Sequence, residues 1–249
     1  MSKFLHYLFE SSLLLAVLYC FYWLIMRKDT FFRLNRFYLL FSVLVSELVP
    51  LVPVNISVSQ PIIPVLDYVQ KVMVTPVEIR QVSGSDLHYY EIITWLYIAG
   101  TLFFLAVFLF RIINFLRVVR NHTLIRKEGL NVVLMKSAYA PFSFFNIVFI
   151  NEDLYNSHDD LSAILSHERI HASQFHTIDI LIIEACKIFQ WFNPFIWFLE
   201  RSMKNNHEFI ADQSVISGGV EKSAYQELLF SQVTGMKFSS LANNLNHSP

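Results

Sequence analysis

Three long apolar runs near the N-terminus constrain the fold of this chain more than any other feature of its sequence. Residues 4–26 carry one charged side chain, Glu10, and residues 92–110 carry none. Residues 37–54 form a third run, which is interrupted by Glu47. About 20 consecutive apolar residues are enough for a helix to cross the hydrocarbon core of a bilayer. The sequence therefore predicts three transmembrane helices over these runs.

The composition supports a membrane protein and argues against nucleic-acid binding. Of the 249 residues, 54% are hydrophobic and only 16% are charged, whereas soluble domains typically have about 25% charged residues. The formal net charge of -1 provides no basic surface for a nucleic acid. The two cysteines form no CxxC motif, so neither a disulfide framework nor a cysteine-bound metal is indicated. The expected surroundings are a lipid bilayer.

The distribution of lysine and arginine predicts how the chain is oriented. Loops rich in these residues stay on the cytoplasmic side of a membrane. Residues 27–36 and the region after the third run are basic, while residues 55–91 hold four acidic and two basic side chains. We expect a multi-pass protein of the plasma (inner) membrane with its N-terminus and loop 55–91 outside. The chain then divides into a membrane region, 1–110, and a cytoplasmic domain, 111–249.

The pattern of the sequence changes after the third run and predicts an α+β domain. Residues 123–127 and 131–136 flank Gly129 and have the composition of a strand pair around a tight turn. A further strand is expected at 147–150. Apolar residues at helical spacing then predict a helix over 159–175. The expected fold class is a mainly α membrane protein with a small α+β cytoplasmic domain.

The helix expected at 159–175 contains the motif His-Glu-x-x-His. His167 and His171 are four residues apart, so both can reach one ion from the same helix face. Glu168 points to the side of this pair and can accept the proton of a metal-bound water. Two imidazoles and an open position suit Zn²⁺. The alternative is a solvated helix face that happens to carry two histidines and a glutamate.

A second acidic pair further along the chain can complete this set. Glu208 and Asp212 are four residues apart on another expected helix. Glu208 can serve as the third metal ligand, and Asp212 can accept the N–H of a histidine ligand. By itself such a pair is more typical of a solvated helix face. Together with the histidine motif it favours a zinc site.

Several segments resemble the membrane zinc metallopeptidases of the BlaR/MecR antibiotic-sensor type, which are similar to the HtpX-like and prenyl-protein gluzincins. The segments are His167–His171, Phe192–Trp197 and Glu208–Asp212. Residues 140–144 resemble the segment that precedes the catalytic helix in that family. The resemblance extends over nearly the whole chain, and it implies a gluzincin-type endopeptidase domain in the cytoplasm.

The resemblance also implies a role for each matching residue. It assigns His167, His171 and Glu208 as zinc ligands and Glu168 as the catalytic base. His247 corresponds to a region where related gluzincins place a histidine near the reacting carbonyl, so it is a candidate for stabilising the transition state. The alternative for His247 is a flexible polar residue of the C-terminal tail.

The chain also departs from the family pattern. Family members usually have another span after this region, and sensors carry an extracytoplasmic ligand-binding domain. Both are expected to be missing here, and no SxxK motif indicates penicillin binding. These differences fit either a fragment of a longer receptor or a separate membrane peptidase.

Residues 178–199 are apolar enough to raise the question of a fourth span. A crossing would move Glu208 about 30 Å away from the histidines, whereas zinc requires ligands at about 2 Å. The segment also contains residues that are costly in lipid, namely Asp179, Glu184, Lys187, Gln190, Asn193 and Pro194. We therefore predict an interfacial or re-entrant helical hairpin that breaks near Asn193–Pro194 and returns to the same side.

Four other polar residues are not assigned to the metal site. His176 is five residues after His171 and is expected on a different helix face, outside the site. His207 either points toward the site or is exposed to solvent. Glu10 and Glu47 are expected at the wetted outer boundary of the membrane.

The predicted function is an integral-membrane zinc endopeptidase in regulatory proteolysis or transmembrane signalling. Its substrate is expected to be a protein or peptide, either its own chain or a cytoplasmic regulator. The strand at 147–150 is expected to offer its edge to an extended substrate. The alternatives are a housekeeping peptidase that clears damaged membrane proteins and a non-catalytic signalling scaffold with a structural metal site.

Overall fold

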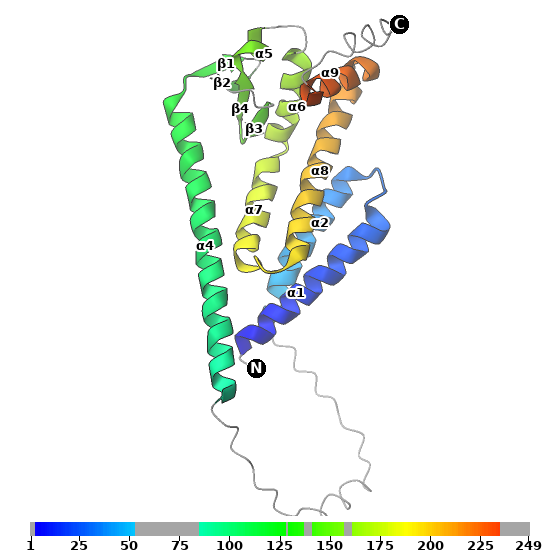
Figure 1. The fold of residues 1–249 in the computed structure, drawn as a ribbon. Coiled ribbons are helices and arrows are strands. Elements are labelled where there is room, and N and C mark those ends of the chain that lie inside the picture. The colour runs from blue at the N-terminus through cyan, green and yellow to red at the C-terminus, as the bar shows by residue number, and fades with distance from the viewer. Residues whose placement is uncertain (1–2, 53–84, 128, 137–140, 157–160, 235–249) are drawn as a thin grey trace, which may run out of the picture.

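The computed structural model describes residues 3–52, 85–127, 129–136, 141–156 and 161–234 (Figure 1). Over these ranges the chain is mostly helical and includes one four-stranded sheet. The helices are α1 (Lys3–Phe21), α2 (Phe32–Leu48), α4 (Ser85–Asn121), α5 (Glu152–Asn156), α6 (Leu161–Ser173), α7 (His176–Phe189), α8 (Pro194–Ser217) and α9 (Lys222–Thr234). The strands are β1 (Leu124–Lys127), β2 (Leu130–Met135), β3 (Phe142–Phe144) and β4 (Ile147–Asn151).

Three helices in the described part of the chain are long and apolar enough to cross a membrane. They cover Lys3–Met26, Phe32–Leu51 and Tyr89–Asn121, where a π turn (Tyr22–Met26) extends α1 and a 3-10 turn (Val49–Leu51) extends α2. This confirms the three apolar helices predicted from the sequence. The second begins five residues early and the third ends later, because hydropathy marks the apolar core of a helix and not its ends. Loop 55–91 lies mostly outside the described residues.

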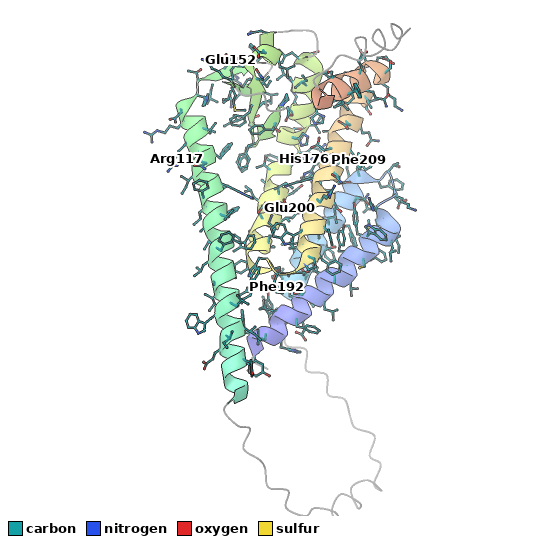
Figure 2. All side chains as sticks on the ribbon, in the orientation of Figure 1. Arg117, Glu152, His176, Phe192, Glu200 and Phe209 are labelled. Carbon is teal, nitrogen blue, oxygen red and sulfur yellow. The ribbon has the colours of Figure 1, made fainter. Side chains whose placement is uncertain are left out.

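Helices α7 and α8 form a hairpin that packs against α1 and α2, while α4 runs along the other side of α7 (Figure 1). The core of this bundle consists of side chains with no exposed surface, namely Leu15, Leu39, Val43, Ile183, Ile196, Leu199 and Met203. Phe192 lies at the turn of the hairpin, and His176 lies toward the other end of α7 (Figure 2).

The turn of the hairpin falls where the sequence predicted a break. Asn193 has extended backbone angles and its side chain accepts a hydrogen bond from the Phe195 N–H at 3.0 Å, which caps α8. Pro194 occupies the first helical position, where its missing N–H has no cost. The predicted hairpin over residues 178–199 is therefore present, and its position relative to a membrane stays a prediction.

Polar residues of this hairpin are paired with one another and with residues of α1 and α2. Lys187 is 5% exposed, and its Nζ lies 2.6 Å from Glu200 Oε2 and 2.8 Å from Glu184 Oε1. At the turn, the Gln190 side chain donates to Ser11 and to Glu47 at 2.7 Å each. Pairing within the hairpin and with α1 and α2 satisfies groups that would otherwise be costly to bury.

The sheet has the strand order β1-β2-β4-β3. β1 and β2 are antiparallel around Gly129, whose φ of 83° suits a residue without a Cβ. β2 and β4 are parallel, and β3 is antiparallel to β4. The strands predicted at 123–127, 131–136 and 147–150 are confirmed within one or two residues. β3 was not predicted, because three residues are too few to show a period.

One prediction about the sheet is wrong. β4 (Ile147–Asn151) was expected to offer a free edge, but it pairs with both β2 and β3. β1 and β3 are the two outer strands of the described sheet, and β3 contacts α6. The edge nearest to the histidine motif therefore belongs to Phe142–Phe144.

Helix α6 lies between the sheet and α8. Its Leu161 and Leu165 pack on Val132, Val148 and Ile150 of the sheet. On another side, Ile164 packs on Val215 of α8 and on Tyr225 and Leu228 of α9. Because α6 has partners on both sides, its orientation relative to α8 is fixed.

Candidate metal centre

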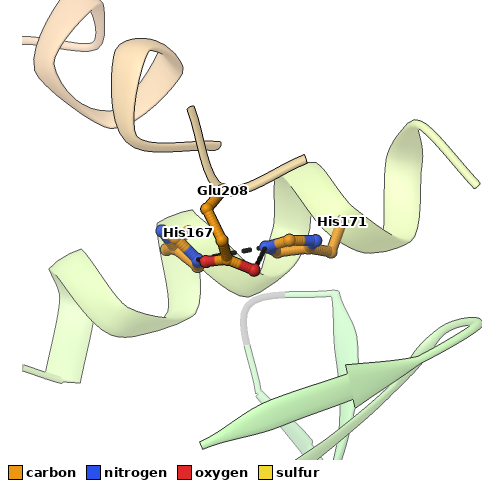
Figure 3. Close-up of side chains that lie close together, drawn as sticks. All are labelled: His167, His171 and Glu208. Carbon is orange, nitrogen blue, oxygen red and sulfur yellow. Dashed lines mark hydrogen bonds and ion pairs between the residues drawn. The ribbon is translucent and has the colours of Figure 1, made fainter. Parts of the chain in front are cut away.

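Helices α6 and α8 bring the three predicted ligands together (Figure 3). His167 and His171 project from neighbouring turns of α6, and Glu208 reaches them from the middle of α8. His167 Nε2 lies 3.0 Å from His171 Nε2 and 3.3 Å from Glu208 Oε2. Glu208 Oε1 lies 3.7 Å from His171 Nε2. These residues form a group whose potential ligand atoms are all within 4.8 Å of one another.

The separations fit a single tetrahedral ion. Ligand atoms at about 2.0–2.1 Å from a tetrahedral metal lie roughly 3.3 Å from one another. The three observed separations, 3.0, 3.3 and 3.7 Å, surround that value. The Glu208 side chain is 57% exposed, which leaves the site open to a water or a substrate. The donor set of two imidazoles and one carboxylate suits zinc.

Asp212 lies one helical turn beyond Glu208 and contacts the first histidine. Its Oδ1 is 3.2 Å from His167 Nδ1 and accepts a hydrogen bond from the Tyr225 hydroxyl at 2.8 Å. The same hydroxyl is 2.8 Å from His167 Nδ1. The structure therefore brings Asp212 beside His167, and its support of a metal ligand stays a prediction. Tyr225 was missed, because nothing in the sequence indicates that α9 folds back over α6.

The other side of the site contains two more histidines: His176, which was expected outside the site, and His207, for which the sequence left two alternatives open. His176 Nδ1 lies 2.8 Å from His171 Nδ1, so the expectation that His176 faces away is wrong. That expectation assumes that one continuous helix includes residue 176. Instead, α6 ends at Ser173, Phe175 takes a left-handed conformation (φ 56°), and α7 begins at His176. His207 is buried, and its Nε2 lies 2.7 Å from Asp179 Oδ2.

Glu168 is buried, 6% exposed, beside the histidine pair. Burial raises its pKa above the usual value, although a hydrogen bond with Ser143 and the charge of His167 work against this. A raised pKa makes the carboxylate a stronger base, as a residue that abstracts a proton requires. Its position is consistent with the role predicted for it.

Two pockets share the candidate ligands His171 and Glu208, and the first is also lined by His167. The first has a volume of about 310 Å³ and is lined by Pro141, Phe142, Ser143, Ile164, His167, Glu168, His171, Glu208, Tyr225, Leu228 and Leu229. The second, of about 200 Å³, is lined by Ser143, Phe144, His171, His176, Thr177, Ile180, Leu181, Lys204, His207 and Glu208. Both are lined by Ser143 of β3, with Phe142 in the first and Phe144 in the second, so this strand borders both pockets.

The charges around the site keep Glu208 ionised, which favours the binding of a metal cation. Burial raises the pKa of Glu208, but a hydrogen bond with His167 and the charges of both histidines lower it below the usual value. Burial lowers the pKa of His167, but hydrogen bonds with Asp212 and Glu208 outweigh it and raise this pKa to about 9. Burial lowers the pKa of His171, and the charge of His167 lowers it further. A metal must compete with a proton at His167.

His247, the candidate for stabilising the transition state, lies outside the described residues. Its role stays a prediction from the resemblance alone.

Comparison with known proteins agrees with the site. Residues 146–248 match the model of a family described as BlaR1 peptidase M56. This stretch contains β4, α6 and α8, and with them the candidate ligands, Glu168 and Asp212. Among curated proteins no match was found. The match at residues 146–248 therefore supports the resemblance to BlaR1/MecR-type peptidases that was noted in the sequence.

Proposed function

We propose that this protein is an integral-membrane zinc endopeptidase in which His167, His171 and Glu208 hold the metal. The observation that carries the proposal is the distance between the three ligand atoms, which is close to that of a tetrahedral zinc site. The family match supports the peptidase activity. The placement of Glu168 in the pocket beside the ligands supports catalysis over a purely structural metal site.

Zinc, when bound, supplies a Lewis acid that polarises the scissile carbonyl and lowers the pKa of a bound water. Glu168 would act first as a base, by taking a proton from the attacking water, and then as an acid, by giving a proton to the leaving amine. Asp212 and Tyr225 hold His167 in the orientation that ligation requires. His171 and Glu208 complete the set.

The outer strand β3 is suited to bind the substrate chain. It lies at the edge of the sheet and lines both pockets. An extended peptide added to such an edge gains main-chain hydrogen bonds. A peptide on β3 would cross the metal site between the two pockets, with its side chains directed into them. Protein and peptide substrates therefore fit this arrangement, among them the protein's own chain or a cytoplasmic regulator.

We further propose that the site faces the cytoplasm, close to the membrane surface, and that cleavage serves regulation or transmembrane signalling. The basic residues of loop 27–36 and of the end of α4 support this orientation. The hairpin of α7 and α8 supports it as well, because it returns α8 to the side of α6. A division into a membrane region (1–110) and a peptidase domain (111–249) follows, although α4 continues through the boundary to Asn121.

The proposal is tested with Glu168→Gln in the purified full chain. The variant is expected to keep zinc, because the three ligands remain, but to lose cleavage of its own chain and of protein substrates by about 10²–10⁴-fold. Zinc content is measured by metal analysis and cleavage by mass spectrometry. Glu227→Gln on α9, an exposed residue outside the site, serves as the matched control and should match the wild type.

Two outcomes contradict the proposal in different ways. Cleavage by Glu168→Gln at the wild-type rate would rule out Glu168 as the base. Stoichiometric zinc in a wild-type protein that cleaves nothing would favour a signalling scaffold with a structural metal site.

A further inference from the structure

The two candidate histidine ligands differ in what contacts their second ring nitrogen. His167 Nδ1 faces a carboxylate and a phenol, whereas His171 Nδ1 faces the Nδ1 of another histidine, His176, at 2.8 Å. A neutral imidazole that binds a metal through Nε2 carries its hydrogen on Nδ1. If His171 binds zinc as proposed above, it must donate this hydrogen to His176. The acceptor must then be held in place, because it sets the orientation of the His171 ring.

The His176 ring is fixed by stacking. It lies 3.9 Å from the His207 ring, with an angle of 5° between the two planes. Both residues are 3% exposed, so neither ring has room to move into solvent. His207 is held in turn by Asp179, which is 4% exposed and lies 2.7 Å from His207 Nε2. Each ring therefore has a partner that limits its rotation.

Asp179 is held by an arginine from a different part of the chain. Arg36, in the second turn of α2, donates to Asp179 from Nε at 2.6 Å and from a terminal nitrogen at 3.2 Å. The same terminal nitrogen donates to the Gln174 carbonyl at 2.6 Å, where α6 ends. A forked contact of this kind fixes direction as well as distance. Arg36, Asp179 and His207, the clamp, thus join α2, α7 and α8 and anchor the end of α6.

We propose that His176 is a positioning residue for the metal ligand His171, and that the clamp of Arg36, Asp179 and His207 holds His176 in place. This inference rests on the proposed zinc site, and it links that site to the membrane-type helices. The connection runs from α2, one of the three long apolar helices, to a metal ligand on α6. The orientation of His171 therefore depends on how α2 packs against α7 and α8.

A pair of substitutions at His176 separates positioning from packing. His176→Phe keeps a ring to stack on His207 but removes the acceptor, while His176→Asn can place an amide oxygen near the position of Nδ1. In the purified full chain, zinc affinity is measured by competition with a chelator. His176→Phe is expected to bind zinc about 10–100-fold more weakly, the range for lost partners of metal ligands. His176→Asn is expected to recover most of this loss.

Two further measurements exclude a general effect on folding. The visible absorption of the Co²⁺-substituted protein should change in His176→Phe, because it reports the geometry around the metal. Tyr19→Phe removes a hydrogen bond with Ser202 elsewhere in the bundle and is the control. It should leave zinc affinity and the Co²⁺ spectrum unchanged.

The clamp is tested by combining substitutions. If Arg36 acts through His176, then Arg36→Met weakens zinc binding, and the double variant with His176→Phe binds no more weakly than His176→Phe alone. When two residues act through the same contacts, their effects on the free energy of zinc binding do not add, so the second substitution causes no further loss. Where Arg36→Met does not yield folded protein, Asp179→Asn takes its place, since it keeps the size of the side chain. If the losses of zinc affinity in the two single variants multiply in the double variant, the two residues act independently and the role of the clamp is ruled out.

The outcomes also distinguish this inference from the proposed function. A wild-type protein that binds no zinc contradicts the proposed function. A wild-type protein whose zinc binding requires Glu208, but whose affinity and Co²⁺ spectrum do not change in His176→Phe, contradicts only the positioning role.

Discussion

The chemistry of the site depends on a few side chains that differ in their exposure to solvent. Glu168 is buried beside the pocket, whereas the Glu208 side chain is 57% exposed. Burial raises the pKa of Glu168, while the histidines lower the pKa of Glu208. Glu168 therefore holds a proton more readily than Glu208 does. This difference agrees with Glu168 as the base and Glu208 as a metal ligand. The difference arises from surroundings that the sequence motif does not describe.

Asp212 provides a prediction at this scale. Asp212→Asn removes the charge that faces His167 Nδ1 at 3.2 Å and leaves the three ligands in place. The zinc affinity of the purified protein is expected to fall about 10–100-fold, because the histidine loses its carboxylate partner. Asp153→Asn on α5, an exposed aspartate away from the site, is the control in the same chelator competition. Equal affinities of the two variants would exclude a supporting role for Asp212.

At the scale of elements, the site depends on where α6 ends. A single helix through residue 176 would direct His176 away from His171. The left-handed Phe175 and the turn before α7 instead bring the two rings to hydrogen-bonding distance. The turn between β3 and β4 is tied to the start of α7 as well, since the Phe145 N–H donates to Thr177 Oγ1 at 2.9 Å. Strand β3 is thereby held beside the metal site.

The contact between α4 and the hairpin gives a second prediction. A Cβ on Gly100 would lie 2.3 Å from two ring carbons of Trp191, far inside van der Waals contact. Trp191 also stacks on Phe104, with ring centroids 6.0 Å apart, so it has limited freedom to withdraw. Gly100→Ala is expected to destabilise the protein by about 1–3 kcal/mol through overpacking.

Thermal unfolding in detergent measures this effect. Ala99→Val adds volume at the neighbouring exposed position of α4 and should unfold at the wild-type temperature. If Gly100→Ala also unfolds at the wild-type temperature, α4 is not packed against Trp191 in solution.

At the scale of the whole molecule, two groups of elements meet at the candidate metal centre. The apolar helices and the α7–α8 hairpin lie on one side of it, and the sheet with α6 and α9 lies on the other (Figure 1). The hairpin makes this possible because it starts and ends near α6. Arg36 adds a direct link between α2 and this junction.

The proposed topology predicts the behaviour of reporter fusions. A reporter after residue 219 should give a cytoplasmic signal, as should one after residue 28 in the basic first loop, because the hairpin returns to its starting side. A reporter after residue 84 should give an external signal and serves as the control. An external signal after residue 219 would contradict the cytoplasmic placement of the peptidase domain.

The sequence by itself determined the features that repeat at short range. Apolar runs marked the three long helices, and the four-residue spacings placed His167 with His171 and Glu208 with Asp212. Asn193–Pro194 marked the hairpin turn. All of these follow from the period of a helix or the conformation of single residues, which neighbours along the chain are sufficient to fix.

Only the tertiary structure decided which distant residues meet. Strand β3 is the outer strand beside α6, Tyr225 approaches His167 from α9, and Arg36 reaches Asp179 across 143 positions of sequence. His176 joined the site because α6 ends before it. Such contacts depend on how helices and strands pack, and packing is set by the whole apolar core and by the pairing of buried charges. No local period in the sequence carries that information.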